Sequence, residues 1–420
     1  MTFVAGWPLR RGTALPVTKR RFSLGFKFLL NGPLISSTNE SNGAAMKVVS
    51  LICAVGATLA LFGCGGGSGG TSATSTSIPT ASAPVANAPA ASTPAVSAPA
   101  ASTPVSAQAK QVLGYFTGSS DSMVSATAAA TPITAVSMDV VLVAADGTLS
   151  GALPVNLLSS DLAAGRASYA SISNFGATDF DPVIAHGALV TNRATALQNI
   201  VALAQTANLT GINLDFEGID PADRDAYTSF VTDLAVQLHA IHSTLLLSVP
   251  AKTSDDATNT WTWPYNYAAL GRSADLIQVM TYDETVPNRA PGPVAGSDWM
   301  LASLQYAATQ IPANKILLGL PAYGYDWNLT AGSGTSVAYK DTPTLLVSTG
   351  ATPQWDATTN SAHISYTASD GSAHEVWYET AQGLQVKAQF AKTLDLAGVS
   401  MWALGDEDAS FWSAITAAIN

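Results

Sequence analysis

The sequence has little cysteine. Its 420 residues include two, Cys53 and Cys64, and both lie in one apolar segment near the N-terminus. The remainder of the chain has none. Its stability therefore cannot depend on disulfide bonds, whatever the compartment in which the protein works.

Positive charge is also scarce. The chain holds 18 Lys and Arg against 29 Asp and Glu, and residues 1–63 contain seven of the basic residues but one acid. The rest is strongly acidic and has no basic patch, so we expect it to bind neither nucleic acid nor anionic lipid surfaces. The five His residues show no spacing such as His-x-x-x-His. We therefore expect no metal site and no cofactor.

The N-terminal region contains a segment typical of a targeting signal. From Met46 the chain reads MKVVSLICAVGATLALFGCGGGSGG, a Lys followed by about fifteen mostly apolar residues, which is typical of a signal peptide and short for a membrane-spanning helix. The run ends in Leu-Phe-Gly-Cys and resembles the bacterial lipobox, with Cys64 as the lipidated residue, although Phe62 departs from the usual small or β-branched residue. The alternatives are an ordinary secretory signal and an uncleaved anchor.

The segments beside this signal (residues 46–64) predict no folded domain. Residues 1–45 are basic and precede Met46, and we expect them to be an over-extended reading frame. Residues 65–109 are rich in Gly and Ser, then in Pro, Ala, Ser and Thr, and predict a disordered linker because they cannot bury a core. Together these features predict a lipid-anchored lipoprotein of the bacterial cell envelope, periplasmic or surface-facing.

Residues 110–420 alternate between short β-rich runs and helical patterns. Eight such runs predict strands at Gln111–Phe116, Ala135–Val143, Ala167–Phe175, Thr210–Glu217, Thr244–Val249, Asp275–Asp283, Lys315–Pro321 and Gly398–Leu404. Helical patterns lie between them at Thr191–Thr206, Pro221–His242, Ser297–Gln310 and Thr380–Leu394. Eight strand–helix repeats predict an α/β fold, a (β/α)8 TIM barrel. An open doubly wound sheet is the alternative, and it is disfavoured because no Gly-rich phosphate loop follows an early strand.

One connection is too long for a βα unit. Residues from about 325 to 377 are rich in Thr, Ser, Gly and Tyr and contain short β-prone pieces. They predict a small α+β or antiparallel insertion between strands seven and eight. It would follow the C-terminal end of a strand, on the face where barrels place their active sites.

The fourth predicted strand carries acids that an apolar strand does not need. Side chains alternate along a strand, so Asn213, Asp215 and Glu217 share one face while apolar residues occupy the other. The polar face would line the barrel interior and rise to its C-terminal mouth at Glu217. A buried polar network that only stabilises the barrel is the alternative, but the position of Glu217 at the strand's end favours catalysis.

At these residues the chain resembles glycoside hydrolase family 18, whose strand-four signature is D-G-x-D-x-D-x-E. Here the segment reads T-G-I-N-L-D-F-E. Four further segments match family patterns in the same order: QVMTYD at 278–283, KILLGLPAYGYDW at 315–327, VWYET at 376–380 and GVSMWALGDED at 398–408. The resemblance covers about Val112 to Asp408 and is strongest to the branch of spore-cortex-lytic N-acetylglucosaminidases.

The resemblance implies a retaining hydrolase that cleaves β-1,4 linkages in glycans containing N-acetylglucosamine, such as chitin oligosaccharides or peptidoglycan. Family 18 uses the substrate's own acetamido oxygen as nucleophile and passes through an oxazolinium ion. Glu217 would be the general acid and base, Asp215 would hold the acetamido N–H, and Tyr282 would orient the acetamido group. Candidate substrate-binding residues are Asn213, Gln278, Met280, Asp283, Trp402, Tyr115 and Tyr323.

Other interpretations remain open. Tyr282 and Asp283 could be a polar cap at a strand end, and Trp402 could be core packing. The whole chain could be a non-catalytic, lectin-like glycan-binding lipoprotein on the same barrel, or a purely structural surface lipoprotein. Relatives that lose catalysis usually lose the Glu or the adjacent Asp, and both are present here. We expect a monomer.

Asn213 departs from the family pattern. In the full signature an Asp at this place can share a proton with the middle acid, because two adjacent carboxylates do not easily both ionise. With Asn213 there, the sequence predicts that Asp215 stays ionised through the reaction and exchanges no proton with the position below it. Replacing Asn213 by Asp is then expected to retain activity and to alter the acid limb of the pH profile.

Overall fold

The computed structural model describes residues 109–420. The expected over-extended N-terminus, the signal peptide with Cys64 and nearly all of the expected linker therefore lie outside the described residues. Within the described residues, no helix is long and apolar enough to span a membrane.

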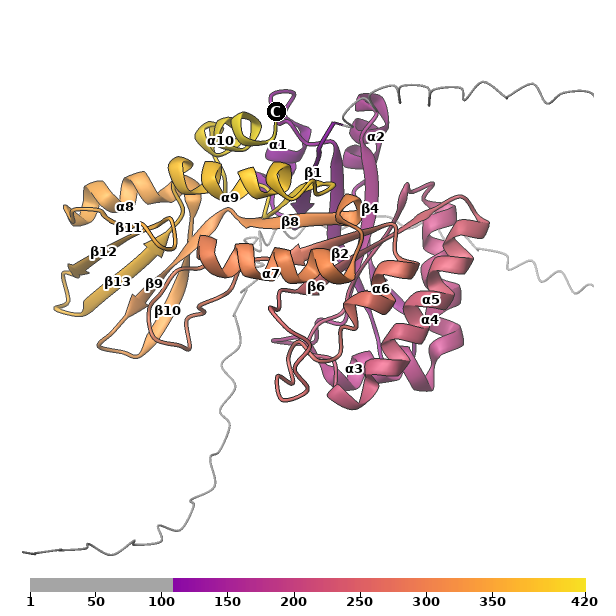
Figure 1. Ribbon diagram of the computed structural model, residues 1–420. Helices are drawn as coiled ribbons and strands as arrows, with labels where there is room; N and C mark the ends of the chain where they lie inside the picture. Colours follow the sequence, from indigo (N-terminus) through magenta and orange to yellow (C-terminus); the bar gives the residue numbers. More distant parts are fainter. Residues whose placement is uncertain (1–108) are drawn as a thin grey trace, which may run out of the picture. The chain divides into compact units, whose positions relative to one another are not determined.

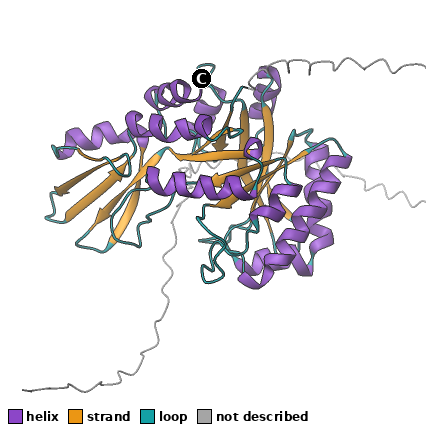
Figure 2. Cartoon of the chain, viewed as in Figure 1, coloured by secondary structure: helices purple, strands orange, loops and turns teal. Residues whose placement is uncertain are grey.

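Eight parallel strands close into a barrel, as the sequence predicts (Figures 1 and 2). Their order is β1-β14-β8-β7-β6-β5-β4-β2, and β2 pairs with β1 to complete the circle. The open doubly wound alternative is therefore wrong. The strands are β1 Gln111–Phe116, β2 Ala135–Val143, β4 Ala167–Ser173, β5 Gly211–Asp215, β6 Thr244–Pro250, β7 Leu276–Met280, β8 Ile316–Pro321 and β14 Gly398–Trp402.

Helices follow the strands and cover the outside of the barrel (Figure 1). The four predicted helices are present as α4 Arg193–Thr206, α5 Arg224–Ala240, α7 Ser297–Gln310 and α9 Ala381–Thr393. Shorter helices that the sequence did not predict are α1 Ser120–Thr127, α2 Val155–Ala164, α3 Pro182–His186 with a π-helical turn at Gly187–Thr191, α6 Tyr267–Ser273 and α10 Ala409–Ile419. Single 3-10 turns lie at Pro221–Asp223, Ala313–Lys315 and Tyr339–Asp341.

Apolar side chains on the outer face of the barrel strands form one large core with these helices. Ile212 and Leu214 of β5, and Phe216 directly after it, belong to this core and are fully buried. A smaller cluster fills the lower interior of the barrel with Leu113, Tyr115, Ala135, Tyr169, Leu246 and Leu317. The polar side chains on the inward face of β5 therefore lie beyond this apolar cluster, toward the C-terminal end of the barrel. Active sites of such barrels lie at that end.

The long connection after β8 forms the insertion that the sequence predicts. It is a five-stranded antiparallel sheet, ordered β10-β9-β13-β12-β11, with helix α8 Thr342–Thr349. The sheet lies beside the barrel, left of it in Figure 1. Its strands are β9 Tyr323–Asn328, β10 Ser333–Ala338, β11 Gln354–Asp356, β12 Ser361–Thr367 and β13 Ala373–Tyr378.

Strand β2 has two features that its sequence did not reveal. A short strand, β3 Leu149–Gly151, pairs with it in antiparallel fashion beyond the barrel. The register between β2 and β4 also shifts between Met138 and Val141, which marks a β-bulge. Bulges re-aim side chains and are common at barrel rims beside active sites.

Candidate active site

Asn213 lies at the centre of a buried hydrogen-bond network inside the barrel. Its amide nitrogen donates to Ser137 Oγ at 3.0 Å and to Tyr115 Oη at 3.2 Å, and its amide oxygen accepts from Ser248 Oγ at 3.1 Å. Tyr115 and Ser248 share a further hydrogen bond of 2.8 Å. Four strands thus meet at one side chain, which confirms that the polar face of β5 points inward. Asn213 is fully buried and its amide is occupied by these hydrogen bonds, so it supports the barrel interior. The sequence analysis had instead expected it to contact the substrate.

Glu217 lies two residues beyond the end of β5, at the C-terminal mouth of the barrel. Asn174 holds its backbone on both sides: the amide nitrogen of Asn174 donates to the Glu217 carbonyl at 2.8 Å, and the Glu217 N–H donates to Asn174 Oδ1 at 2.8 Å. Tyr265 donates its hydroxyl to the preceding carbonyl, that of Phe216, at 2.7 Å. The carboxyl group of Glu217 makes no hydrogen bond within residues 109–420 and is half-buried, so it can face a substrate.

Asp215 ends β5 and is 5% exposed. Its Oδ1 is buried and has no hydrogen-bond partner among the described residues. Burial, and then the negative charge of Asp139, raise the pKa of Asp215 well above its ordinary value. This raised pKa argues against the expectation that Asp215 stays ionised throughout. The sequence analysis predicted the strand Ala135–Val143 but did not consider the acid on it, Asp139.

The surroundings of Glu217 favour the neutral form of its carboxyl group. Burial is the largest cause of a pKa well above the usual range, followed by the charges of Asp215, Asp283 and Asp139. Burial also raises the pKa of Asp139 to about 6 and, less strongly, that of Asp283. A carboxyl group that keeps its proton near neutral pH can act as a general acid.

Asp283 connects the barrel to the insertion. It follows β7 with a positive φ of 60°, and its Oδ1 accepts from the hydroxyls of Tyr323 at 2.6 Å and Tyr325 at 2.7 Å. Both tyrosines belong to β9. Tyr323 is 6% exposed, so its hydroxyl orients Asp283 and is not free for the sugar contact predicted from the sequence.

Strand β7 provides the remaining predicted site residues. Gln278 is fully buried and donates to the hydroxyl of Tyr282 at 3.1 Å, while its Oε1 accepts a longer bond of 3.4 Å from Tyr115. Gln278 and Tyr115 therefore position Tyr282. They do not reach the cleft, although the sequence analysis had expected both to bind substrate. Tyr282 and Met280 are partly exposed at the end of the strand.

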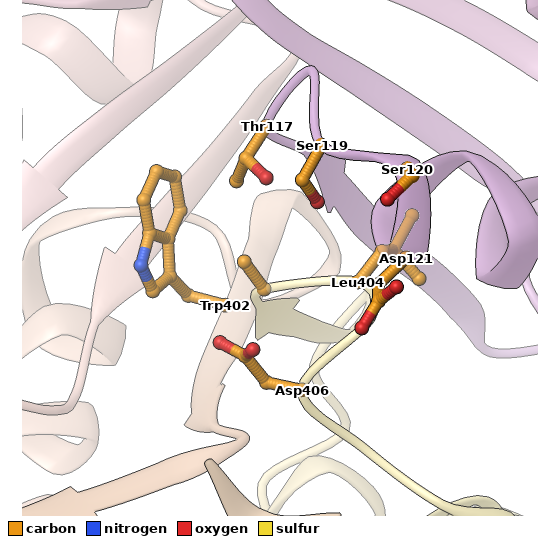
Figure 3. A pocket seen from close by; sticks show the side chains of 8 residues that line it. Thr117, Ser119, Ser120, Asp121, Trp402, Leu404 and Asp406 are labelled. Carbon is orange, nitrogen blue, oxygen red and sulfur yellow. The ribbon is translucent and has the colours of Figure 1, made fainter. Parts of the chain in front are cut away.

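Trp402, at the end of β14, borders a cavity of about 390 Å³. Its ring lies 5.4 Å from that of Tyr115, and its peptide bond with Ala403 is cis. Figure 3 shows the indole and Asp406 facing the loop that follows β1. The lining residues are Thr117, Ser119, Ser120, Asp121, Trp402, Ala403, Leu404 and Asp406. Trp402 is thus half-buried at a cavity wall and is not only core packing.

The sequence analysis did not consider two residues of this region. Asp139 lies on the inward face of β2, and Asn174 follows β4. Trp261 lies in the loop after β6, is 47% exposed, and approaches Gly218, the residue after Glu217. Within the described part of the chain no group of His, Cys, Asp or Glu is arranged to hold a metal ion. The site is therefore a set of carboxyl, amide and aromatic groups.

Comparison with known proteins agrees with this geometry. The family described as glycosyl hydrolases family 18 matches residues 167–408, more than half of the chain. The uncharacterized glycosylase YvbX of Bacillus subtilis is 36% identical over 312 residues, which cover 73% of this chain and 91% of that protein. The cortical fragment-lytic enzyme of B. subtilis is 32% identical over 213 residues, covering 50% of this chain and 49% of that enzyme.

Solved structures share the fold. The crystal structure of a chitinase from Chromobacterium violaceum has a TM-score of 0.72 and 38% identity, covering 74% of this chain and 99% of the other. The spore cortex-lytic enzyme SleL of Bacillus cereus, at 24% identity, has a TM-score of 0.69 over 74% of this chain and 75% of its own. With the family match and the arrangement of Asp215 and Glu217, the chain belongs to glycoside hydrolase family 18 and is a glycoside hydrolase.

Proposed function

We propose that this hydrolase cleaves β-1,4 linkages in glycans that contain N-acetylglucosamine, with retention of configuration and assistance from the substrate. The observation that carries the proposal is the pair Asp215 and Glu217. A half-buried Glu217 with a raised pKa stands at the barrel mouth, and Asp215 two residues before it has a buried oxygen without a partner among the described residues.

These positions support the following reaction. Glu217 donates its proton to the glycosidic oxygen while the acetamido oxygen of the substrate attacks the anomeric carbon, so that the leaving sugar departs and an oxazolinium ion forms. Asp215 accepts the acetamido N–H and stabilises the positive charge. Glu217, now a carboxylate, removes a proton from the water that attacks the anomeric carbon. The bond from this carbon to the acetamido oxygen breaks, which restores the acetamido group, and Glu217 is again the acid. Tyr282, held by Gln278, orients the acetamido group.

The substrate class is supported by the cavity beside Trp402 and by the relatives. An aromatic side chain at a cavity wall can stack on the apolar face of a sugar ring. The printed names of the relatives include both chitinases and cortical fragment-lytic enzymes. We therefore propose chitin oligosaccharides and peptidoglycan as the two substrates to test.

Mass spectrometry of products from N-acetylglucosamine oligomers and from peptidoglycan, digested in parallel, tests the proposal. The wild-type protein is expected to release product from at least one of them, and Glu217→Gln from neither. If the wild-type protein cleaves neither substrate, the proposed function is wrong. Oligosaccharide binding measured by calorimetry, without turnover, would instead indicate the lectin-like alternative.

We also propose, from the sequence alone, that the chain is anchored to a bacterial membrane by a lipid on Cys64. The apolar run that ends in Leu-Phe-Gly-Cys supports this. Metabolic labelling with a palmitate analogue is expected to mark the wild-type protein and not Cys64→Ala. Equal labelling of the two would contradict the anchor. Mass analysis of the natively produced protein would at the same time show whether residues 1–45 are present, since an intact Met1 would contradict an over-extended reading frame.

A further inference from the structure

Asp215 needs a proton acceptor if it is to act as a carboxylate. Stabilising a positive oxazolinium ion requires a carboxylate, yet burial favours the neutral acid. The position below it on the same strand offers no help. The amide of Asn213 already donates to Ser137 and Tyr115 and accepts from Ser248, and an amide does not take up a carboxylic proton.

Asp139 lies at the right level of the barrel for this task. One layer down, β2 and β5 touch across the interior, because Asn213 donates to Ser137 at 3.0 Å. Asp139 stands two residues above Ser137, as Asp215 stands two above Asn213. Alternate strands of such a barrel contribute to the same interior layer, and β2 and β5 are alternate strands, separated by β4.

The bulge in β2 comes directly after the segment that carries Asp139. Met138 and Val141 both belong to the outer core, and the register with β4 shifts between them. Asp139 is left facing Ser171 of β4, the residue that pairs in register with Asn213.

The environment of this carboxyl pair holds acids and phenols. The negative charge of Asp139 raises the pKa of Asp215, Glu217 and Tyr115. The negative charge of Asp215 raises the pKa of Tyr227, Tyr265 and Tyr282. No Lys or Arg of the described residues is among the groups that shift the pKa of either member. Two like charges in such a place do not both ionise easily, so a carboxyl pair there can hold one proton between its members.

We propose that Asp139 is the proton partner of Asp215 and replaces, from another strand, the acid that is missing at Asn213. When the acetamido group engages, the shared proton moves from Asp215 to Asp139, so that Asp215 becomes the carboxylate and the charge of the pair is unchanged. Asp139 is thus a positioning residue that acts through Asp215. The proposal rests on the proposed function for its role in turnover, but the shared proton itself does not.

Carboxyl NMR tests the shared proton without any substrate. In protein labelled with ¹³C at the aspartate side-chain carboxyl, the signal assigned through Asp215→Asn is expected to titrate in two steps separated by about one pH unit or more. In Asp139→Asn these steps should merge into a single step between them. The exposed Asp225→Asn is the control and should leave both steps in place. An Asp215 titration that is the same in Asp139→Asn and wild type would overturn the proposal.

The pH profile of kcat/KM then tests the role in turnover. Without its partner, Asp215 must lose its proton to water, so the acid limb of Asp139→Asn is expected to move about one pH unit toward neutrality. The double variant Asp139→Asn/Asn213→Asp restores a second acid and should move the limb back. A limb that stays in place in both variants would overturn the role in turnover. If the wild-type protein shows no turnover at all, the proposed function fails, and the NMR titration still decides whether the proton is shared.

Discussion

The side-chain amide of Asn174 makes two hydrogen bonds to the backbone of Glu217. It donates to the Glu217 carbonyl and accepts from the Glu217 N–H, each at 2.8 Å. Asn174 is fully buried at the end of β4, the strand that pairs with β5. Glu217, the proposed general acid, therefore takes its position from a neighbouring strand as well as from its own. A side chain that supplies donor and acceptor together cannot be replaced by a carboxylate, which only accepts.

Asn174→Ala is expected to lower kcat by about 10- to 100-fold with little change in KM, since small displacements of a catalytic group are expensive. It should also lower the free energy of unfolding by about 1–3 kcal/mol, because a buried N–H loses its acceptor. The control is Asn199→Ala, which removes a similar bond of 2.8 Å to the carbonyl of Gly147 far from the site. Equal kcat values in both variants would argue against a positioning role for Asn174.

The alkaline limb of the pH profile should follow the charge around Glu217. The acid must be protonated to donate, so activity is lost as pH rises through its raised pKa. Asp283 is among the negative groups that raise it. In Asp283→Asn the pKa of Glu217 falls and the alkaline limb is expected to move to lower pH, while the amide oxygen can still accept from Tyr323 and Tyr325. A limb that moves to higher pH would contradict this electrostatic account.

Burying Asp215 should make the protein less stable at neutral pH than it would be with an amide there. Its pKa in the folded state lies well above the ordinary 3.8. The stability that the protonated acid contributes is therefore complete below about pH 4 and is lost as pH rises through the folded-state pKa. Asp215→Asn is expected to gain about 1 kcal/mol or more over wild type at pH 7.5, since each unit of pKa shift is worth about 1.4 kcal/mol.

Urea unfolding of wild type and Asp215→Asn at pH 4 and pH 7.5 measures this difference. The two proteins should be of similar stability at pH 4 and should separate at pH 7.5. A difference that is larger at pH 4 would mean that the folded-state pKa is depressed and not raised.

A buried ion pair links the insertion to the barrel. Lys387 of α9 contacts both carboxyl oxygens of Glu379 at 2.6 Å and Ser361 Oγ of β12 at 3.1 Å, and both charged side chains are almost fully buried. Lys387→Met leaves the carboxyl without its partner and is expected to cost about 3–5 kcal/mol of unfolding free energy. Denaturant unfolding measures it. The double variant Lys387→Met/Glu379→Leu should recover most of that loss, and no recovery would contradict the ion-pair explanation.

The barrel could be predicted from the sequence because its eight strands are short, apolar and regularly spaced, and their positions differ from the structure by a few residues at the ends. Shorter helices such as α2 and α6 were missed, since seven to ten residues of mixed composition carry little periodic signal. The insertion was predicted from the length of its connection, its composition and its short β-prone pieces. Its strand order required the structure.

Asp215 and Glu217 could be proposed as site residues from the sequence because one strand carries the whole signal. Asp139 could have been found by the same criterion, because it is a single acid in the apolar run AVSMDVVLV. Asn174 had the weaker signal of a polar residue at a strand's C-terminal end. The bond from Tyr323 to Asp283 joins residues 40 apart in sequence, and nothing in either segment indicates the pairing.

A single residue, Ala322, separates barrel strand β8 from β9, the strand that supplies Tyr323 and Tyr325. The insertion has no flexible linker at this end, and the ion pair of Lys387 joins its other end to α9. Insertion and barrel should therefore lose their structure in one cooperative transition. Evolutionary change in the sheet is constrained accordingly, because a shift of β9 would be transmitted through Tyr323 and Tyr325 to Asp283, whose charge acts on Glu217.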